Sequence, residues 1–354
     1  MIRLLIVDDS ALVRTQLAQL FAEEGGFEIA QARNGAEAVE QVRALHPDVI
    51  TLDINMPQMD GLTALSLIMT ERPTPVVMVS SLTEQGALVT LEALHLGAVD
   101  YIAKPGGTIS RSFGDIRREL VAKVRAAAGA RLRHGEPVRA RPAPHSSPRA
   151  TPAPAPSLRP ARRAGLVLIG VSTGGPKTLE DILPDLPADF PWPVVIAQHM
   201  PAAFTRSFAE RLDRVCPLKV VEAATPVALE PGCAYVAKGG ADLVVADRAG
   251  RLFAVPKPEN PAFAWHPSVE VLARSALQHC PAQRLVAVML TGMGNDGADG
   301  FAEIRQRGGR TIAESAETAI VHGMPRELIL RDGAEVVLPA QKIADQLNRW
   351  AAGG

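Results

Sequence analysis

The sequence predicts an α/β protein made of two doubly wound, mostly parallel domains that are joined by a proline-rich linker. Three observations support this fold class. The chain has 354 residues, short apolar runs alternate with helical periodicity in two separate stretches, and prolines concentrate between those stretches. At roughly 100–200 residues per domain, the length alone predicts two domains. We place the domains at residues 1–130 and 165–354 and the linker at 131–164.

The composition excludes several classes of function. The chain carries 37 Lys and Arg against 38 Asp and Glu, so no overall basic field favours nucleic acid or an anionic membrane surface. No apolar run approaches the roughly 18 residues that a membrane span needs. Three widely spaced cysteines without a Cys-x-x-Cys pair are typical of a reducing compartment. We therefore expect a soluble cytoplasmic protein with no nucleic-acid partner and no membrane insertion.

The linker is defined by its prolines. Residues 135–163 contain 8 of the chain's 29 prolines and a single acidic residue, Glu136. Such a segment has too few apolar side chains to offset the entropy of ordering, and it favours extended polyproline II structure. We expect a semi-stiff tether, with docking of a partner by its arginines as the alternative.

The first domain is expected to contain five β/α units. Apolar residues recur at helical spacing between the apolar runs, and a final helix is expected around residues 113–124. A helix between successive parallel strands gives a doubly wound (βα)5 sheet. The expected strands are residues 4–7, 27–30, 49–52, 76–79 and 99–103.

The second domain repeats this alternation and adds an antiparallel excursion. Residues 242–255 are expected to form a hairpin whose turn is Arg248-Ala249-Gly250. The other strands are followed mostly by helices and are expected to form a second, mostly parallel sheet. They are residues 166–169, 194–197, 220–223, 285–290, 310–313 and 335–338.

Polar residues mark the carboxyl ends of the strands in the first domain, where a parallel sheet forms its ligand crevice. Three converging carboxylates repel one another unless a cation joins them, and an all-oxygen site suits Mg²⁺. A neighbouring lysine can hold a phosphoryl oxygen, and a strand-end hydroxyl can contact it. The residues are Asp8 and Asp9 after the first strand, Asp53 after the third, Ser80 and Ser81 after the fourth, and Lys104 after the fifth.

Three strand ends of the second domain offer a serine, a histidine and an aspartate to one crevice. Ser172 lies in Gly170-x-Ser172-x-Gly174, a spacing that resembles a nucleophile elbow between a strand and a helix. His199 follows the next strand, and Asp296 follows the strand at 285–290. This set supplies a nucleophile, a general base and a carboxylate that orients the base. The chain order Ser, His, Asp differs from that of α/β-hydrolases, so we expect a separate fold.

Two glycine-rich loops in the same domain have nucleotide-binding alternatives that we consider weaker. Residues 170–178 nearly match a P-loop, but Pro176 occupies the lysine position and displaces Lys177 around the helix. Residues 292–297 match Gly-x-Gly-x-x-Gly, but Asp296 occupies the place where a pyrophosphate approaches. Both loops are better explained by catalysis.

The first domain resembles the receiver domain of bacterial response regulators in LLIVDDS, LDINMPQMDG, MVSS and DYIAKP. The resemblance implies that Asp53 accepts phosphate from a histidine kinase. It assigns Mg²⁺ to Asp8, Asp9, Asp53 and the backbone carbonyl of Asn55, and phosphate contact to Lys104. Ser80 is the expected switch hydroxyl, with Ser81 as the alternative, and Tyr101 is the expected aromatic switch.

The second domain resembles the chemotaxis protein-glutamate methylesterase, which is also a glutamine deamidase, in GVSTGGP, AQHMP, PSVEVL, LTGMGNDGADG and HGMP. The resemblance implies that Ser172 is the nucleophile, His199 the base and Asp296 the orienting acid. It adds an oxyanion contact from the Met293 backbone amide and a substrate-binding surface near Thr173, with no cofactor in this domain.

The two resemblances together imply a phosphorylation-activated esterase for sensory adaptation. It removes γ-methyl esters from glutamates, and deamidates glutamines, on the cytoplasmic helices of methyl-accepting chemotaxis receptors. A chemotaxis histidine kinase is the expected phosphodonor, and the unphosphorylated receiver is expected to cover the crevice. Two alternatives stay open at this point: the same triad acting on another substrate, and an interaction protein whose triad is idle.

Overall fold

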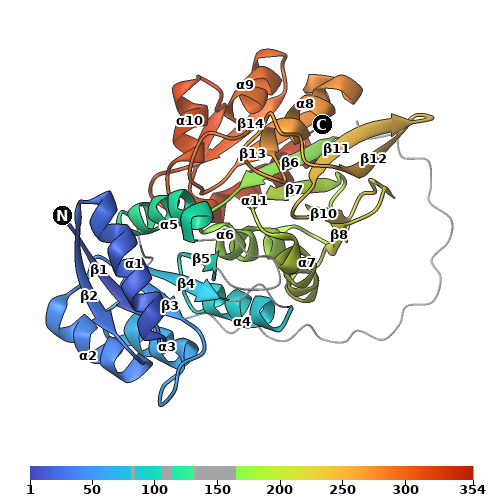
Figure 1. Ribbon diagram of the computed structural model, residues 1–354. Helices are drawn as coiled ribbons and strands as arrows, with labels where there is room; N and C mark the ends of the chain where they lie inside the picture. Colours follow the sequence, from blue (N-terminus) through green and yellow to red (C-terminus); the bar gives the residue numbers. More distant parts are fainter. Residues whose placement is uncertain (81–83, 105–112, 131, 133–164, 354) are drawn as a thin grey trace, which may run out of the picture.

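The computed structural model describes residues 1–80, 84–104, 113–130, 132 and 165–353 (Figure 1). Except for Leu132, the expected linker lies outside the described residues. Ser81 also lies outside them, as does the side chain of Ser80.

The first domain is the predicted (βα)5 unit. In the described residues it contains a five-stranded sheet in the order β2-β1-β3-β4-β5, and every pairing is parallel. The strands are β1 (Ile2–Val7), β2 (Phe27–Ala32), β3 (Val49–Asp53), β4 (Val76–Ser80) and β5 (Asp100–Ala103). The helices are α1 (Ala11–Glu24), α2 (Gly35–Leu45), α3 (Gly61–Glu71), α4 (Glu84–His95) and α5 (Phe113–Ala128).

Alternation along β1 explains how this sheet is covered on both faces. Leu5 and Val7 pack with α2 and α3, whereas Leu4 and Ile6 pack with α1 and α5. Both sets are buried, as the continuous apolar run predicts for a parallel strand between two helical layers. Helix starts follow local chemistry: the side chains of Ser10, Asn34 and Asp60 accept hydrogen bonds from the first turns of α1, α2 and α3.

The second domain is built on a seven-stranded sheet, counted over the described residues, in the order β15-β14-β13-β6-β7-β10-β8. All its pairings are parallel, as predicted. The strands are β6 (Leu166–Val171), β7 (Val194–Gln198), β8 (Lys219–Ala223), β10 (Cys233–Ala237), β13 (Leu285–Met289), β14 (Arg310–Glu314) and β15 (Val336–Leu338). Our expectation omitted β10, although its five consecutive apolar residues after Pro231-Gly232 are a usable strand signal.

The predicted hairpin is confirmed and belongs to a larger unit. β11 (Asp242–Arg248) pairs antiparallel with β12 (Arg251–Lys257), and β12 pairs with β9 (Val227–Ala228). Ala249 and Gly250 form the turn with positive φ angles of 54° and 81°. The two-residue β9 was not predicted, because so short a strand has no periodicity of its own.

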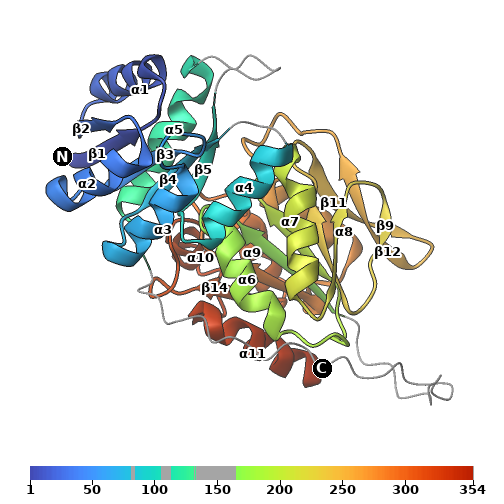
Figure 2. The same ribbon diagram turned by 90° about the horizontal axis from the view of Figure 1, so that it is seen from below.

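Two helical layers sandwich the seven-stranded sheet (Figure 2). One layer contains α6 (Gly175–Ile182), α7 (Ala202–Val215) and α11 (Ala340–Ala352), and the other contains α8 (Val269–His279), α9 (Ala298–Gln306) and α10 (Met324–Leu330). Val167 and Ile169 of β6 face the first layer, and Leu166 and Leu168 face the second. The central strands β13, β6 and β7 are therefore held rigidly between both layers.

The two domains share an apolar core. Both views show α4 of the first domain beside α6 and α7 of the second domain (Figures 1 and 2). Leu91 and Leu94 of α4 belong to the same buried cluster as Phe204 and Phe208 of α7. Among the described residues, no helix is long and apolar enough to cross a bilayer.

Candidate active site

The three residues expected to act together follow three neighbouring strands. Ser172 comes directly after β6, His199 directly after β7, and Asp296 lies in the loop between β13 and α9. Because β13, β6 and β7 are adjacent and parallel, their carboxyl ends meet at one edge of the sheet. The topology therefore brings the three loops together.

A direct contact joins the histidine to the aspartate. His199 Nε2 lies 2.8 Å from Asp296 Oδ2, and both side chains are more than nine-tenths buried. Because an ionised carboxylate only accepts hydrogen bonds, Nε2 carries the hydrogen. The second ring nitrogen, Nδ1, is buried and has no hydrogen-bond partner within the described residues. It is thus the nitrogen whose lone pair is available to take a proton.

Asp296 is fixed by the start of α8. Its carboxylate accepts hydrogen bonds from the Ser268 hydroxyl at 2.9 Å and from the backbone N–H groups of Val269 and Glu270 at 2.7 and 3.1 Å. Burial raises the pKa of the Asp296 carboxyl, but the bonds from His199 and from this helix N-terminus outweigh burial and lower the pKa below its usual value. Asp296 is therefore an anion aimed at the imidazole.

The serine occupies a tight turn that neighbouring backbone defines. The Ser172 N–H donates to the Thr291 carbonyl at 3.0 Å, and the Ser172 carbonyl accepts from Gly175 N–H at 2.8 Å and from Gln198 Nε2 at 3.0 Å. A Cβ at Gly292 would lie 2.7 Å from the Ser172 Cβ, so the β13 loop approaches the serine too closely for any residue but glycine. The serine side chain is half-buried.

Neither glycine-rich loop is arranged for a nucleotide. Lys177, the residue nearest to a P-loop lysine, forms an ion pair with Asp181 one turn along α6, at 2.7 Å. In the other loop, Asp296 is directed at α8 and His199, as described above. Both observations support our preference for the catalytic interpretation of the two loops.

Two further expected residues lie beside the serine. Thr173 is buried, and its hydroxyl donates to Asp100 Oδ2 of the receiver strand β5 at 2.5 Å. Met293 is half-buried in the loop that also contains Gly292 and Gly294. Thr173 is thus held by the receiver in this state, which our sequence analysis did not predict.

Sequence analysis missed Trp265. Its ring stacks on the His199 imidazole with centroids 5.4 Å apart and planes 1° from parallel. A tryptophan before His266-Pro267 carries no signal of this contact, because the two aromatic residues are 66 positions apart. The sequence does carry a signal for Ser268, which bonds to Asp296. It precedes a segment with helical apolar periodicity, as an N-cap residue does.

The receiver crevice collects the expected acids. Ligand oxygens of Asp8, Asp9 and Asp53 lie within 4.8 Å of one another, and Lys104 Nζ lies 2.9 Å from Asp8 and 2.7 Å from Asp53. Asn55 is exposed just beyond β3. Oxygen donors in this number suit Mg²⁺, so the residues present fit the cation.

The backbone around Asp53 is tightly packed against the start of α3. A Cβ at Gly61 would lie 2.0 Å from the Asp53 carbonyl, which explains why glycine follows Met59-Asp60.

Burial and the local charges shift the pKa values in this crevice. Burial raises the pKa of the Asp53 carboxyl, and Lys104 offsets only part of that rise. Burial lowers the pKa of Lys104, but the two carboxylates outweigh burial and raise it. The lysine is therefore a permanent cation beside Asp53.

Tyr101, the expected aromatic switch, is buried against the second domain. Its ring stacks on that of Phe204 in α7, with centroids 4.6 Å apart and planes 28° from parallel. Lys123 of α5 holds the adjacent backbone by donating to the Tyr101 carbonyl at 2.7 Å and pairing with Asp100 at 3.1 Å. Residues 100 and 101 thus both reach across the domain interface.

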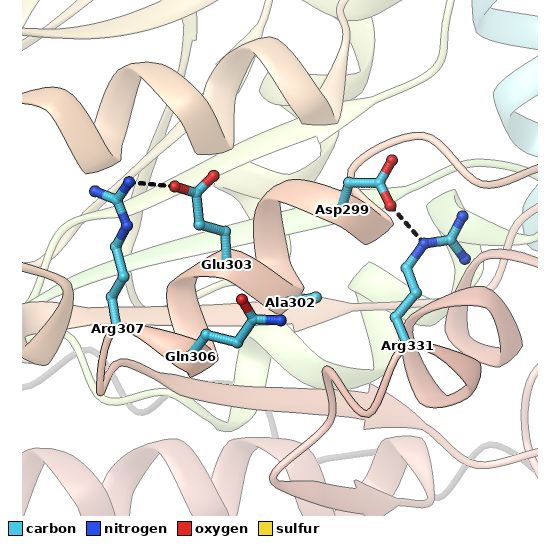
Figure 3. Close-up of a pocket in the computed structure, with 6 residues that line it drawn as sticks. All are labelled: Asp299, Ala302, Glu303, Gln306, Arg307 and Arg331. Carbon is cyan, nitrogen blue, oxygen red and sulfur yellow. Dashed lines mark hydrogen bonds and ion pairs between the residues drawn. The ribbon is translucent and has the colours of Figure 1, made fainter.

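A surface hollow of about 530 Å³ beside α9 and α10 lies apart from this chemistry. Figure 3 shows Arg307 paired with Glu303 and Arg331 paired with Asp299 in it. None of the expected catalytic residues lines the hollow. Its charges neutralise one another, so we do not assign it a role in the reaction.

The fold and the two sites define a class: a response regulator whose receiver domain packs on an α/β domain with a hydrolase-like set of serine, histidine and aspartate. Comparison with known proteins agrees. The response regulator receiver domain matches residues 4–110, and the CheB methylesterase domain matches residues 167–347. The chain belongs to the CheB methylesterase family.

Relatives support this membership along the whole chain. A protein-glutamate methylesterase/protein-glutamine glutaminase of Rhodospirillum rubrum is 56% identical over 99% of this chain and 96% of its own length. One from Caldanaerobacter subterraneus is 49% identical over 98% and 95%, respectively. The crystal structure of the Thermotoga maritima CheB methylesterase catalytic domain matches with a TM-score of 0.51 and 39% identity, covering 53% of this chain and 98% of that one.

Proposed function

We propose that this protein is a phosphorylation-activated serine esterase that hydrolyses glutamate γ-methyl esters on methyl-accepting chemotaxis receptors and deamidates glutamines there. The relatives' shared activity supports the reaction type. The observation that carries the mechanism is the His199–Asp296 pair beside Ser172, with the Nδ1 lone pair left available. We place the protein in the cytoplasm, with its receiver at residues 1–130, a tether at 131–164 and the esterase domain at 165–354.

In the acylation step, Ser172 Oγ attacks the ester carbonyl carbon while His199 Nδ1 takes the hydroxyl proton. Asp296 stabilises the resulting imidazolium through the Nε2 hydrogen. The tetrahedral intermediate collapses as Nδ1 returns the proton to the departing methoxide, which releases methanol. Water then attacks the acyl-serine by the same route in reverse, freeing the glutamate carboxylate; with glutamine, ammonia leaves in place of methanol.

The developing oxyanion needs a donor. We assign this role to the Met293 backbone amide, in the loop that closes over Ser172, and such a donor is worth about 3–4 kcal/mol of barrier. The start of α6 adds a favourable partial charge three residues after the nucleophile. No cofactor is assigned to this domain.

The receiver restrains this site in the unphosphorylated state. Asp100 holds the Thr173 hydroxyl next to the nucleophile, Tyr101 packs on Phe204, and His95 pairs with Glu180 at 2.9 Å. A receptor helix that must reach Thr173 competes with these contacts. Docking of the receiver therefore limits access of a protein substrate, and weakening it raises the fraction of open molecules.

Phosphorylation is the event that weakens docking. A chemotaxis histidine kinase transfers phosphate to Asp53, and Mg²⁺ held by Asp8, Asp9, Asp53 and the Asn55 carbonyl would neutralise charge on the transferred group. Lys104 pairs with a phosphoryl oxygen, and Ser80, or Ser81 in its place, turns toward another. The rearrangement at β4 reaches Tyr101 on the adjacent strand β5 and disturbs its contact with Phe204.

The test is methanol release from a methylated chemoreceptor cytoplasmic fragment, with and without a small phosphodonor. We expect release that increases with the phosphodonor, that is lost in Ser172→Ala and that persists in Ser66→Ala, an exposed serine on α3. Release that survives Ser172→Ala would refute the serine mechanism. No release from a protein whose Asp53 is phosphorylated would favour another substrate, or an interaction protein with an idle triad.

A further inference from the structure

The imidazole of His199, the proposed general base, has few polar contacts. One hydrogen bond, from His199 Nε2 to Asp296, anchors the ring, and within the described residues no protein atom bonds to Nδ1. A ring held at a single atom can still tilt about that bond, and the tilt would change the direction in which Nδ1 points. Something else must define the plane of the imidazole.

Trp265 supplies that plane. The indole lies parallel to the imidazole within 1°, at a centroid separation typical of offset stacking. The indole also lies against the proposed oxyanion loop, since a Cβ at Gly294 would lie 3.1 Å from the indole Cη2. The indole therefore contacts both the histidine and the turn that follows Met293.

The loop that carries Trp265 is clamped at both ends by one buried carboxylate. Asp242, the first residue of β11, accepts hydrogen bonds from the backbone N–H groups of Asn260 and Ser268 at 2.8 and 2.9 Å. Its Oδ1 also lies 3.1 Å from His266 Nδ1, the neighbour of the tryptophan. These bonds hold the loop that carries Trp265 in place. Ser268 also links this loop to the site, because its hydroxyl donates to Asp296.

We propose that Trp265 is a positioning residue for the general base, a role that rests on the proposed function of His199. The indole keeps Nδ1 directed at Ser172, and its π face attracts the imidazolium that forms as the serine proton is taken. Both effects act in the transition state and not on bound substrate, so they raise kcat with little change in KM.

The size of the effect follows from the chemistry. Cation–π attraction at a partly shielded site corresponds to a roughly 2- to 30-fold effect on rate. Leucine fills much of the space of an indole without its π face, whereas phenylalanine keeps a flat ring. We therefore expect Trp265→Leu to lower kcat by about 2- to 30-fold and Trp265→Phe to recover most of that loss.

The experiment measures kcat and KM for methanol release by Trp265→Leu, Trp265→Phe and the unaltered chain, all saturated with phosphodonor. Labelling of Ser172 by a small sulfonyl fluoride gives a second readout of nucleophile activation that needs no receptor. Urea midpoints show whether each variant folds, and Phe253→Leu, a half-buried aromatic on β12, is the matched control.

The expected result is slower turnover and slower labelling in Trp265→Leu, rescue in Trp265→Phe and an unchanged control. Equal rates for the leucine and phenylalanine variants, or a leucine variant that raises only KM, would overturn the proposal. His199→Ala separates this outcome from failure of the proposed function. If His199→Ala stays active, the base is wrongly assigned; if it is inactive while Trp265→Leu is normal, only the role of Trp265 is refuted.

Discussion

Replacing Asp296 by asparagine changes one atom at the centre of the hydrogen-bond network and tests the assignment of the base. Each carboxylate oxygen accepts two bonds: Oδ2 from His199 and Val269, and Oδ1 from Ser268 and Glu270. An amide has only one oxygen. Whichever way it turns, its NH₂ group faces one backbone N–H, from Val269 or Glu270, that loses its acceptor. Its second neighbour on that side, His199 Nε2 or the Ser268 hydroxyl, can bond to the NH₂ group only by accepting.

The loss of rate and the loss of stability follow separately from this geometry. If the amide NH₂ faces the imidazole, Nε2 must give up its hydrogen, and the proton moves to Nδ1, where it blocks uptake of the serine proton. The same exchange in a serine-protease triad lowers kcat by about 10⁴-fold. Each buried donor that loses its acceptor also costs about 1–3 kcal/mol of folding free energy.

The assay is methanol release from a methylated receptor fragment at saturating phosphodonor, together with a urea unfolding curve. Asp299→Asn is the matched control, because Asp299 lies three residues away and pairs with Arg331 at the surface. We expect the control to keep its rate and midpoint. A fall of less than tenfold in kcat for a folded Asp296→Asn protein would refute the role of Asp296 in orienting the base.

The same carboxylate predicts an acid limit to stability. The pKa of Asp296 is lower in the folded protein than in the unfolded chain, so its stabilising contribution is fully present above about pH 4, the ordinary value for aspartate. That contribution is lost as the pH falls through the folded-state pKa. Urea midpoints measured from pH 6 to pH 3 should fall in the unaltered chain and stay flatter in Asp296→Asn.

Three more changes give distinct outcomes. Gly292→Ala places a Cβ 2.7 Å from that of Ser172, and a displaced nucleophile should reduce methanol release by about 10²-fold or more; a normal rate would contradict the close approach. Asp53→Asn should abolish the response to phosphodonor. The folded-state pKa of Asp53 is raised, so its ionised carboxylate destabilises the folded protein at neutral pH. Asp53→Asn removes that charge and should also increase the urea midpoint at pH 7, a gain that disappears below about pH 4. Phe204→Leu removes a ring stack worth about 0.5–1.5 kcal/mol, so the unphosphorylated rate should rise roughly 2- to 13-fold without change in the phosphorylated rate; an unchanged basal rate would show that this contact does not restrain the enzyme.

Residues at strand ends were predictable because parallel topology gathers them without any knowledge of side-chain packing. Ser172, His199 and Asp53 each follow a short apolar run, and such runs identify buried strands. The common edge followed from parallel strands alone, whereas the adjacency of β13, β6 and β7 that brings the three loops together is seen only in the structure. The omitted strands β9 and β10 changed neither site.

Contacts between distant segments were not predictable. The bond from Thr173 to Asp100 spans 73 positions and two domains, and no local pattern records it. The choice of Nε2 over Nδ1 as the partner of Asp296 depends on how the β7 loop approaches the start of α8. Trp265 escaped notice for the same reason: its role comes from three-dimensional packing on His199 and not from its neighbours in the sequence.

The apolar character of the contact between α4 and α7 gives the regulation a temperature dependence. Hydrophobic association weakens on cooling, whereas the hydrogen-bonded contact between His95 and Glu180 is a minor, partly exposed contributor. At low temperature, docking of the unphosphorylated receiver should therefore weaken. The resting turnover should rise, and the ratio of stimulated to resting turnover should fall. The ratio of stimulated to resting turnover would then be largest in warm cells, because the heat capacity of this buried interface sets how strongly the receiver is held.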